Sequence, residues 1–357
     1  MKNKEDIKEI LDYFQRNEEV SLEFDNEAIA KVYQKNDGTH SLAVKILSVF
    51  GGIMGSLAFV VFLAITGLYE SGVGLSVLGI ICIATAIGIN KKYDKIIIDT
   101  ISVSFFIIGF ILLGFGLNQL DVDNNTICAL FVIIALASIV IIQNYILAFI
   151  STLIVSGSIL TLILSNNHED LIHIYVSALA LILTYWFLKE AKIITTNKTL
   201  SKLYNPIRIG LTFSFIAGFA FLGMRWLHWF SPNCIWLSSI IIILAIMYLL
   251  SGLFDVLNIT KKWHKAVIYI FTVLALLPTV FSPAISGAIL LLLLSFLINY
   301  KTGFVLGFMA FIYFISQYYY DLNFTLLTKS LLLLASGVLF LVLYLFTHKK
   351  LTTNEKI

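Results

Sequence analysis

The hydrophobic and polar positions divide the chain into two unequal parts. Residues 1–40 mix charged and apolar positions, whereas the rest consists of long apolar stretches separated by short polar segments. These stretches are close to the ~20 residues that an α-helix needs to cross the hydrocarbon core of a bilayer. A membrane β-barrel would instead show alternating segments of about ten residues. We therefore predict an all-α protein, a polytopic bundle of transmembrane helices.

Twelve apolar stretches support this prediction. They lie approximately at 46–68, 73–89, 99–117, 127–142, 145–164, 171–188, 209–224, 235–254, 266–281, 283–299, 302–320 and 326–346. Some follow one another almost without a linker, as at Gln143-Asn144 and Tyr300-Lys301. Such short junctions predict tight hairpins between neighbouring helices, or a flanking segment that is re-entrant and does not cross the membrane.

The composition excludes other classes of protein. Of the 357 residues, 59% are hydrophobic and 13% are charged, whereas soluble domains have roughly 45–50% apolar and about 25% charged residues. A chain this apolar cannot cover its surface with polar groups in water. We therefore exclude a soluble enzyme, a nucleic-acid-binding protein and a disordered chain, and we expect the lipid bilayer to surround most of the chain.

The distribution of Lys and Arg predicts the orientation in the membrane. Cytoplasmic loops of membrane proteins collect these residues. If the N-terminus is cytoplasmic, the twelve spans leave only Arg225 and Lys329 outside and place the other 22 of the 24 Lys and Arg inside. We therefore predict that both termini are cytoplasmic, which is an N-in/C-in topology.

Residues 1–40 differ from the rest in charge. They contain six Lys or Arg and ten Asp or Glu, and their apolar residues recur at helical spacing. We predict a small acidic cytoplasmic helical head over 1–40, a transmembrane domain over 41–348 and a cytoplasmic tail over 349–357. The head either packs against the cytoplasmic side of the bundle or docks a cytoplasmic protein partner.

Two basic loops resemble each other. Lys91-Lys92-Tyr93-Asp94-Lys95 and Lys261-Lys262-Trp263-His264-Lys265 both read Lys-Lys-aromatic-x-Lys. They fit a parallel repeat of six plus six spans with halves 41–188 and 209–348, an arrangement that some transporters use. The alternative is that the cytoplasmic interface selects Lys and aromatic residues, so that two such loops are similar by chance.

Small residues recur within the predicted spans. Gly51 and Gly55 form a GxxxG pattern, as do Gly303 and Gly307, and three further glycines cluster in the span 99–117. Glycines at such positions allow two helices to approach closely. We expect these residues to mark tight helix packing within the bundle.

The densest group of titratable residues lies in a short outer loop. It contains His168, Asp170 and His173, and the last two are three residues apart, so that one helical face could present both to a metal such as zinc. The simpler interpretation is a solvated turn in which Asp170 caps the next helix. No HExxH, CxxC, phosphate-binding loop or GxSxG motif accompanies it. We therefore expect no cofactor and no enzymatic activity.

The most distinctive segment is near the C-terminus. Tyr318-Tyr319-Tyr320-Asp321-Leu322 is followed by Thr325-Leu326-Leu327-Thr328-Lys329-Ser330, which gives the pattern YYYxLxxTLLxKS. This pattern resembles the closing motif of a family of uncharacterised bacterial polytopic membrane proteins, classed as membrane domains of unknown function. The resemblance implies a multi-pass protein of the bacterial cytoplasmic membrane. It singles out an outer motif as a candidate functional site, made of Tyr319, Tyr320, Asp321, Thr325, Lys329 and Ser330.

Two hypotheses for function follow. The number of spans and the predicted repeat favour a transporter-like carrier of a small or lipidic solute. The alternative is a membrane scaffold or sensor that does not transport and that recruits a partner through residues 1–40. A polar cavity that reaches the middle of the membrane would favour a carrier.

Overall fold

The computed structural model describes residues 42–65, 70–92, 96–168, 170–223, 235–256 and 261–321, and a few positions between 327 and 341. Within these residues all regular structure is helical. The helices are α3 (Leu42–Ile65), α4 (Gly72–Lys92), α5 (Ile96–Gln119), α6 (Asn124–Ile141), α7 (Tyr145–Ser165), α8 (Leu171–Leu188), α9 (Glu190–Thr196), α10 (Lys198–Gly223), α11 (Ile235–Val256), α12 (Lys262–Leu276), the 3₁₀ helix η2 (Leu277–Phe281), α13 (Pro283–Leu297) and α14 (Lys301–Asp321). The predicted fold class is confirmed as all-helical.

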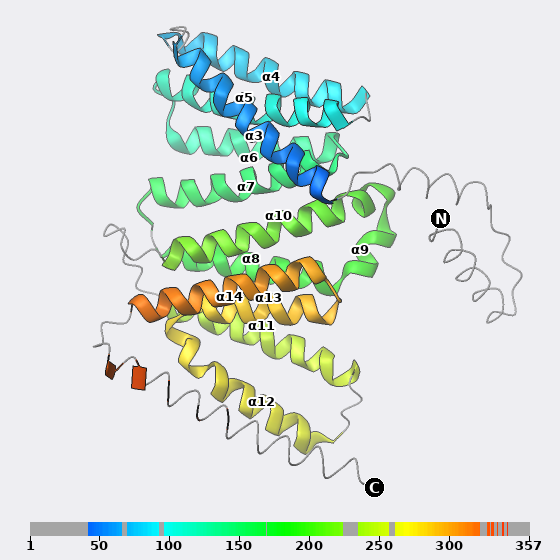
Figure 1. Cartoon of the computed structure of the whole chain (residues 1–357), viewed down its shortest axis with the longest axis vertical. Helices are drawn as coiled ribbons and strands as arrows, with labels where there is room; N and C mark the ends of the chain where they lie inside the picture. The colour runs from blue at the N-terminus through cyan, green and yellow to red at the C-terminus, as the bar shows by residue number, and fades with distance from the viewer. Residues whose placement is uncertain are drawn as a thin grey trace, which may run out of the picture.

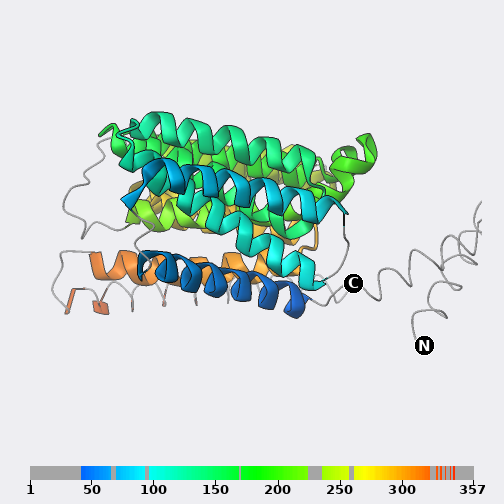
Figure 2. The same cartoon turned by 90° about the horizontal axis from the view of Figure 1, so that it is seen from above.

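The helices stack side by side into an elongated array (Figure 1). The array runs from α3, α4 and α5 through α6, α7 and α10 to α11 and α12, and α13 and α14 pack beside α10 and α11. Seen from above, the long helices follow nearly the same axis (Figure 2). Eight of the described helices are long and apolar enough to cross a membrane. The chain is therefore a multi-pass membrane protein, and the count of twelve spans stays a prediction.

The long helices alternate in direction, which brings the basic segments to one end of the array. The ends of α4, α8 and α11 and the starts of α10, α12 and α14 all lie at the right of Figure 1. The Lys residues of the described loops lie at these helix ends. We call this side the basic end. The predicted separation of charge fits this arrangement, while the cytoplasmic location of the basic end stays a prediction.

Glycines bring α3, α4 and α5 into close contact. A Cβ added to Gly79 of α4 would lie 2.7 Å from the backbone nitrogen of Leu113, and one added to Gly109 of α5 would lie 2.9 Å from the carbonyl oxygen of Gly79. A Cβ on Gly52, beside Gly51, would lie 2.6 Å from Val103. Only glycine permits such close backbone approach. The prediction that glycines mark tight packing is confirmed for Gly109, whereas a Cβ added to Gly51 or Gly55 would make only ordinary contacts, at 3.9 and 3.6 Å.

The described interior contains three buried clusters, of which the smallest joins α3, α4 and α5. The other two are larger. One joins α4, α5, α6 and α7 around Phe106 and Phe110, and the larger joins α8, α10, α11, α13 and α14 around Phe187, Phe215 and Phe219. Helix α7 contributes residues to both clusters and packs along α10. The interior is therefore continuous between the two parts of the array.

Several sequence predictions concern residues outside the described part. The head at 1–40, the tail at 349–357 and most of the predicted span 326–346 lie there. The helix pairs that would correspond in a repeat differ, because α4 packs along α5 extensively whereas α11 makes few contacts with α12. The repeat is not confirmed by this packing and stays a prediction.

Candidate functional site

A buried arginine lies near the basic end of the bundle. Arg208 is 8% exposed and lies within α10, which is itself a candidate membrane span. The helix is longer than the predicted apolar span 209–224, because α10 begins at Lys198 and continues through Pro206. Leu203 and Tyr204 are buried in this first part of the helix, which gives it an apolar face despite its charges. Arg208 is therefore an intrahelical charge and not a loop residue.

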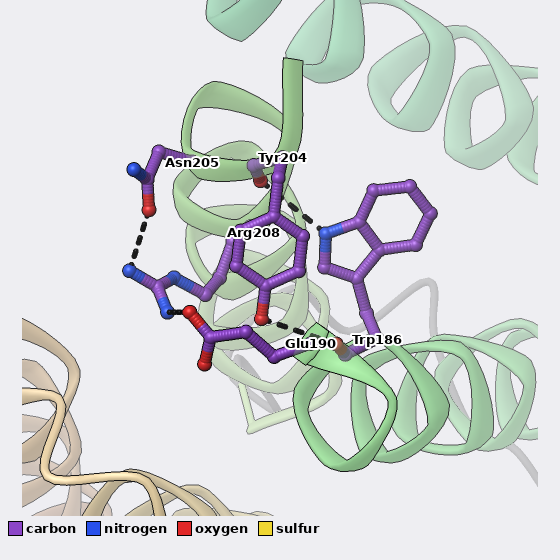
Figure 3. A network of polar contacts seen from close by, with 5 residues as sticks. All are labelled: Trp186, Glu190, Tyr204, Asn205 and Arg208. Carbon is purple, nitrogen blue, oxygen red and sulfur yellow. Dashed lines mark hydrogen bonds and ion pairs between the residues drawn. The ribbon is translucent and has the colours of Figure 1, made fainter. Parts of the chain in front are cut away.

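Polar partners hold only part of the guanidinium group. Nη2 of Arg208 donates a hydrogen bond of 2.6 Å to Oδ1 of Asn205, and Nη1 lies 3.4 Å from Oε1 of Glu190 on α9 (Figure 3). Guanidinium has five N–H donors in a planar fork. Nε of Arg208 is buried and has no hydrogen-bond partner among the described residues. The site therefore holds a positive charge with unused donor capacity.

Aromatic rings surround the same guanidinium. Its central carbon lies 3.8 Å from the ring centroid of Tyr300, 5.0 Å from that of Tyr204 and 5.9 Å from that of Phe187. These distances are in the range of cation–π attraction. Burial raises the pKa of Tyr300, which lies in the turn between α13 and α14, and the Arg208 charge opposes this rise. The rings come from α8, α10 and this turn, so Arg208 joins three parts of the bundle.

Trp186 and Tyr204 fix the position of α8 against α10. Their rings stack with centroids 5.9 Å apart and planes 5° apart. Nε1 of Trp186 donates to the carbonyl oxygen of Tyr204 at 3.3 Å, and Oη of Tyr204 donates to the carbonyl oxygen of Trp186 at 3.1 Å (Figure 3). We call Phe187, Glu190, Tyr204, Asn205, Arg208 and Tyr300 the arginine site.

A carboxylate network lies elsewhere at the basic end. Oδ1 of Asp99, in the first turn of α5, accepts hydrogen bonds from the amides of Asn90 at 3.1 Å and Asn144 at 2.9 Å. Asn144 also caps α7, because its Oδ1 accepts from the backbone N–H groups of Ile146 and Leu147. The network links α4, α5 and α7. Because amide donors surround this oxygen, the arrangement suits a structural anion rather than a cation site.

The predicted outer cluster of titratable residues is only partly brought together. His173 is fully buried, and its Nδ1 lies 2.9 Å from Oγ of Ser238 on α11. Asp170 occupies the N-cap position of α8 but makes no capping hydrogen bond with its side chain. His168 lies in the turn before it. The described residues contain no group of three His, Cys, Asp or Glu that could hold a metal ion, so the metal site stays a prediction.

The predicted outer motif is described only in part. Tyr319, Tyr320 and Asp321 end α14, and the two tyrosine rings lie 5.8 Å apart at 80°. Ser330 donates a hydrogen bond of 2.8 Å to the carbonyl oxygen of Leu327. Thr325 and Lys329 lie outside the described residues. The functional role of this motif therefore stays a prediction.

A groove opens between α8 and α11. Its volume is about 440 Å³, and its walls are Leu181, Thr184, Tyr185, Leu188, Lys189, Ile241, Leu244, Ala245 and Tyr248. Lys189, directly after α8, is the only charged side chain among these lining residues. The α8 residues of the groove and Phe187 of the arginine site lie on different faces of the helix.

Sequence reasoning missed the arginine site and the groove for a physical reason. The predicted span begins at residue 209, so that Arg208 falls in the basic segment that also contains Lys198 and Lys202. A usable signal was present, because Tyr204 and Arg208 are four residues apart and therefore share one face of a helix. Tyr300 and the groove could not be found in this way, since they depend on contacts between helices that are distant in sequence.

The fold and these sites define a helical, multi-pass membrane protein with a buried arginine at one end. A family model described as "Domain of unknown function (DUF4401)" matches residues 41–350. The chain therefore belongs to this family, in agreement with the predicted resemblance to uncharacterised membrane domains. Comparisons with curated proteins and with solved structures gave no match.

Proposed function

We propose that the protein is a transporter-like carrier of a small or lipidic solute, and that this solute is an anion bound by Arg208. The observation that supports the proposal is a guanidinium inside a candidate membrane span, buried and with an unpartnered Nε. Ionisable residues within membrane spans are costly and are commonly kept for function. Arg208 therefore marks the best candidate for a solute site among the described residues.

The ion pair with Glu190 is suited to exchange. The two charged atoms are 3.4 Å apart, and the Glu190 side chain is 31% exposed. A carboxylate or phosphate that pairs with arginine in a two-pronged geometry makes shorter and stronger hydrogen bonds. An incoming anion can therefore displace Glu190 and use the free Nε without leaving Arg208 as an unpaired charge. Because α9 carries Glu190, such an exchange releases one contact between α9 and α10.

The surroundings favour an amphipathic anion over a small hydrophilic one. Three aromatic rings enclose the guanidinium and offer an apolar surface beside its charge. We therefore place a lipidic anion, such as a fatty-acid carboxylate, ahead of inorganic ions.

Thermal unfolding of the full chain in detergent tests the binding step. Decanoate is the probe, with inorganic phosphate and decyltrimethylammonium for comparison. We expect decanoate to raise the melting temperature of the wild type and of the control Lys202→Gln, an exposed cation on the same helix. Arg208→Gln should lose this rise, whereas Glu190→Gln should require less decanoate because the competing carboxylate is gone. Equal responses in the wild type and in Glu190→Gln would overturn the assignment of Arg208 even if Arg208→Gln failed to fold.

Proteoliposomes test the transport step. Vesicles that contain the wild type should move radiolabelled decanoate faster than protein-free vesicles, and faster than vesicles with the Arg208→Gln variant. Rapid passive diffusion of the protonated acid is controlled by measuring at a pH well above the pKa of the acid. If decanoate binds to the protein but does not cross the vesicle membrane faster in its presence, the proposal of a carrier is wrong.

A further inference from the structure

We infer that the groove between α8 and α11 binds one phospholipid with an anionic headgroup, from the leaflet at the basic end. This inference does not rest on the proposed function, because the groove and the arginine site lie on different faces of α8. The argument uses the position, the shape and the charge of the groove.

The groove lies on the part of the protein surface that a bilayer surrounds. Both α8 and α11 are candidate membrane spans. The rims are exposed apolar or aromatic side chains: Leu181 and Tyr185 on α8, and Leu244 and Tyr248 on α11, each more than half exposed. In a membrane such a surface contacts lipid, so the occupant that is always present there is a lipid molecule.

Small side chains form the floor and create the hollow. Thr184 and Ala245 are 5% and 4% exposed and lie between the two rims. The hydroxyl of Thr184 donates a hydrogen bond of 2.7 Å to the carbonyl oxygen of Ala180 in its own helix. Because this hydroxyl already donates its hydrogen bond within α8, an apolar ligand on the floor would leave no donor without a partner. The groove therefore fits a hydrocarbon chain.

The length of the groove matches one leaflet. Along α8 the lining runs from Leu181 to Lys189, which corresponds to about 12 Å at a rise of 1.5 Å per residue. One leaflet contributes about half of the ~30 Å hydrocarbon core. The groove therefore extends over most of the depth of an acyl chain and ends where the headgroups lie.

A positive charge marks the headgroup end. Lys189 follows the last residue of α8, and no described residue forms an ion pair with it. Tyr185 lies one turn before it, and tyrosines are enriched at the membrane interface. A phosphate at this position can pair with the ammonium of Lys189, and an additional negative charge in the headgroup strengthens the attraction.

Lipid retention tests this inference on the full chain. The protein is placed in nanodiscs with equal amounts of phosphatidylglycerol and phosphatidylcholine, released into mild detergent and analysed by native mass spectrometry. We expect the wild type to retain phosphatidylglycerol preferentially. Lys189→Glu should reduce the ratio of retained phosphatidylglycerol to phosphatidylcholine by about fivefold or more, since one cation near the surface contributes roughly that factor. Lys262→Glu, an exposed basic-end cation outside the groove, should keep the wild-type ratio.

A second variant tests the chain-binding part. Ala245→Trp fills the floor and should reduce retention of both lipids. If this variant fails to fold in gel filtration, Lys189→Glu decides alone, because Lys189 is exposed. Arg208→Gln should leave the lipid ratio unchanged, which separates this site from the proposed solute site. The inference is wrong if the wild type retains no phospholipid, or if Lys189→Glu and the wild type give the same ratio.

Discussion

The helix pairs α4–α5 and α8–α11 are both built from apolar candidate spans, yet they pack in opposite ways. Between α4 and α5, glycines bring the backbones together, so that a Cβ on Gly79 or Gly116 would lie within 3 Å of backbone atoms of the other helix. Between α8 and α11, a groove of about 440 Å³ separates the helices toward the basic end. Hydrophobicity therefore does not determine how closely two spans pack.

The difference follows from what drives association in a bilayer. Lipid tails are as apolar as leucine, so that helices associate through close packing and hydrogen bonds rather than through burial from water. The α4–α5 pair uses glycine for close packing. The α8–α11 pair instead has a hydrogen bond between His173 and Ser238 near the outer ends, and opens toward the basic end, where the small side chains of Thr184 and Ala245 form the floor of the groove. A close pair, such as α4–α5, is therefore suited to hold the bundle together. An open pair, such as α8–α11, is suited to bind lipid.

Enlarging a glycine of the close pair should have the largest effect. We expect Gly79→Leu to destabilise the protein by about 3 kcal/mol or more, because overpacking costs roughly 1–3 kcal/mol even where side chains can move and here backbone atoms of Leu113 and Gly109 are in the way. Thermal unfolding in detergent measures this loss. Gly88→Ala is the control, since a Cβ there meets nothing within 4 Å; it should be neutral or stabilising, as alanine favours a helix over glycine. Similar losses in both variants would contradict this account of α4–α5.

The arginine site should show the next largest effect. The Arg208 guanidinium lies 3.8 Å from the Tyr300 ring centroid and is nearly desolvated. A double-mutant cycle with Arg208→Gln and Tyr300→Leu should give a coupling energy of about 1–2 kcal/mol, the range for buried cation–π pairs. The cycle of Arg208→Gln with Tyr248→Leu should give a coupling near zero, because Tyr248 is an exposed groove residue. Equal couplings would show that Tyr300 has no specific role.

These two regions also show how far sequence reasoning reached. The helices of the described part and the close packing at Gly109 follow from apolar length and from small residues, which are local properties of the sequence. The part of α10 before residue 209 does not follow from apolar length, because Lys198 and Lys202 are typical of a loop, yet the helix begins at Lys198 and buries Leu203 and Tyr204.

The candidate sites required tertiary structure. Arg208 was visible as a charge, but its burial depends on Phe187 and Tyr300, which are 21 residues before it and 92 residues after it in the printed sequence. The sequence shows that His173 is a residue of a type that can bind metal. It does not show that its hydrogen-bond partner is a hydroxyl on α11. The charge bias that predicts orientation is summed over whole loops, whereas a site depends on contacts between individual atoms.

Removing the hydrogen bond of the open pair should have a smaller effect. Ser238→Ala deprives the buried Nδ1 of His173 of its partner at 2.9 Å. We expect a loss of about 1 kcal/mol in thermal unfolding, the usual contribution of one hydrogen bond. Ser251→Ala on the same helix is the control, because that hydroxyl is exposed and bonds only within α11 to Tyr248. If Ser251→Ala costs as much as Ser238→Ala, the bond between α8 and α11 does not hold these helices together.

The smallest effect should come from enlarging a residue of the groove floor. Ala245→Leu adds three carbon atoms at a position that faces about 440 Å³ of open groove. We expect the free energy of unfolding to change by less than about 0.5 kcal/mol, as measured by thermal unfolding in detergent. Ala180→Leu is the matched comparison, because both alanines belong to the same buried cluster but only Ala245 lines the groove; Ala180→Leu should cost about 1–3 kcal/mol as ordinary overpacking. The same substitution thus separates a groove from a packed interface. A loss at Ala245 as large as that at Ala180 would mean that α8 and α11 close on each other in the detergent-solubilised protein, and that no space for an acyl chain remains between them.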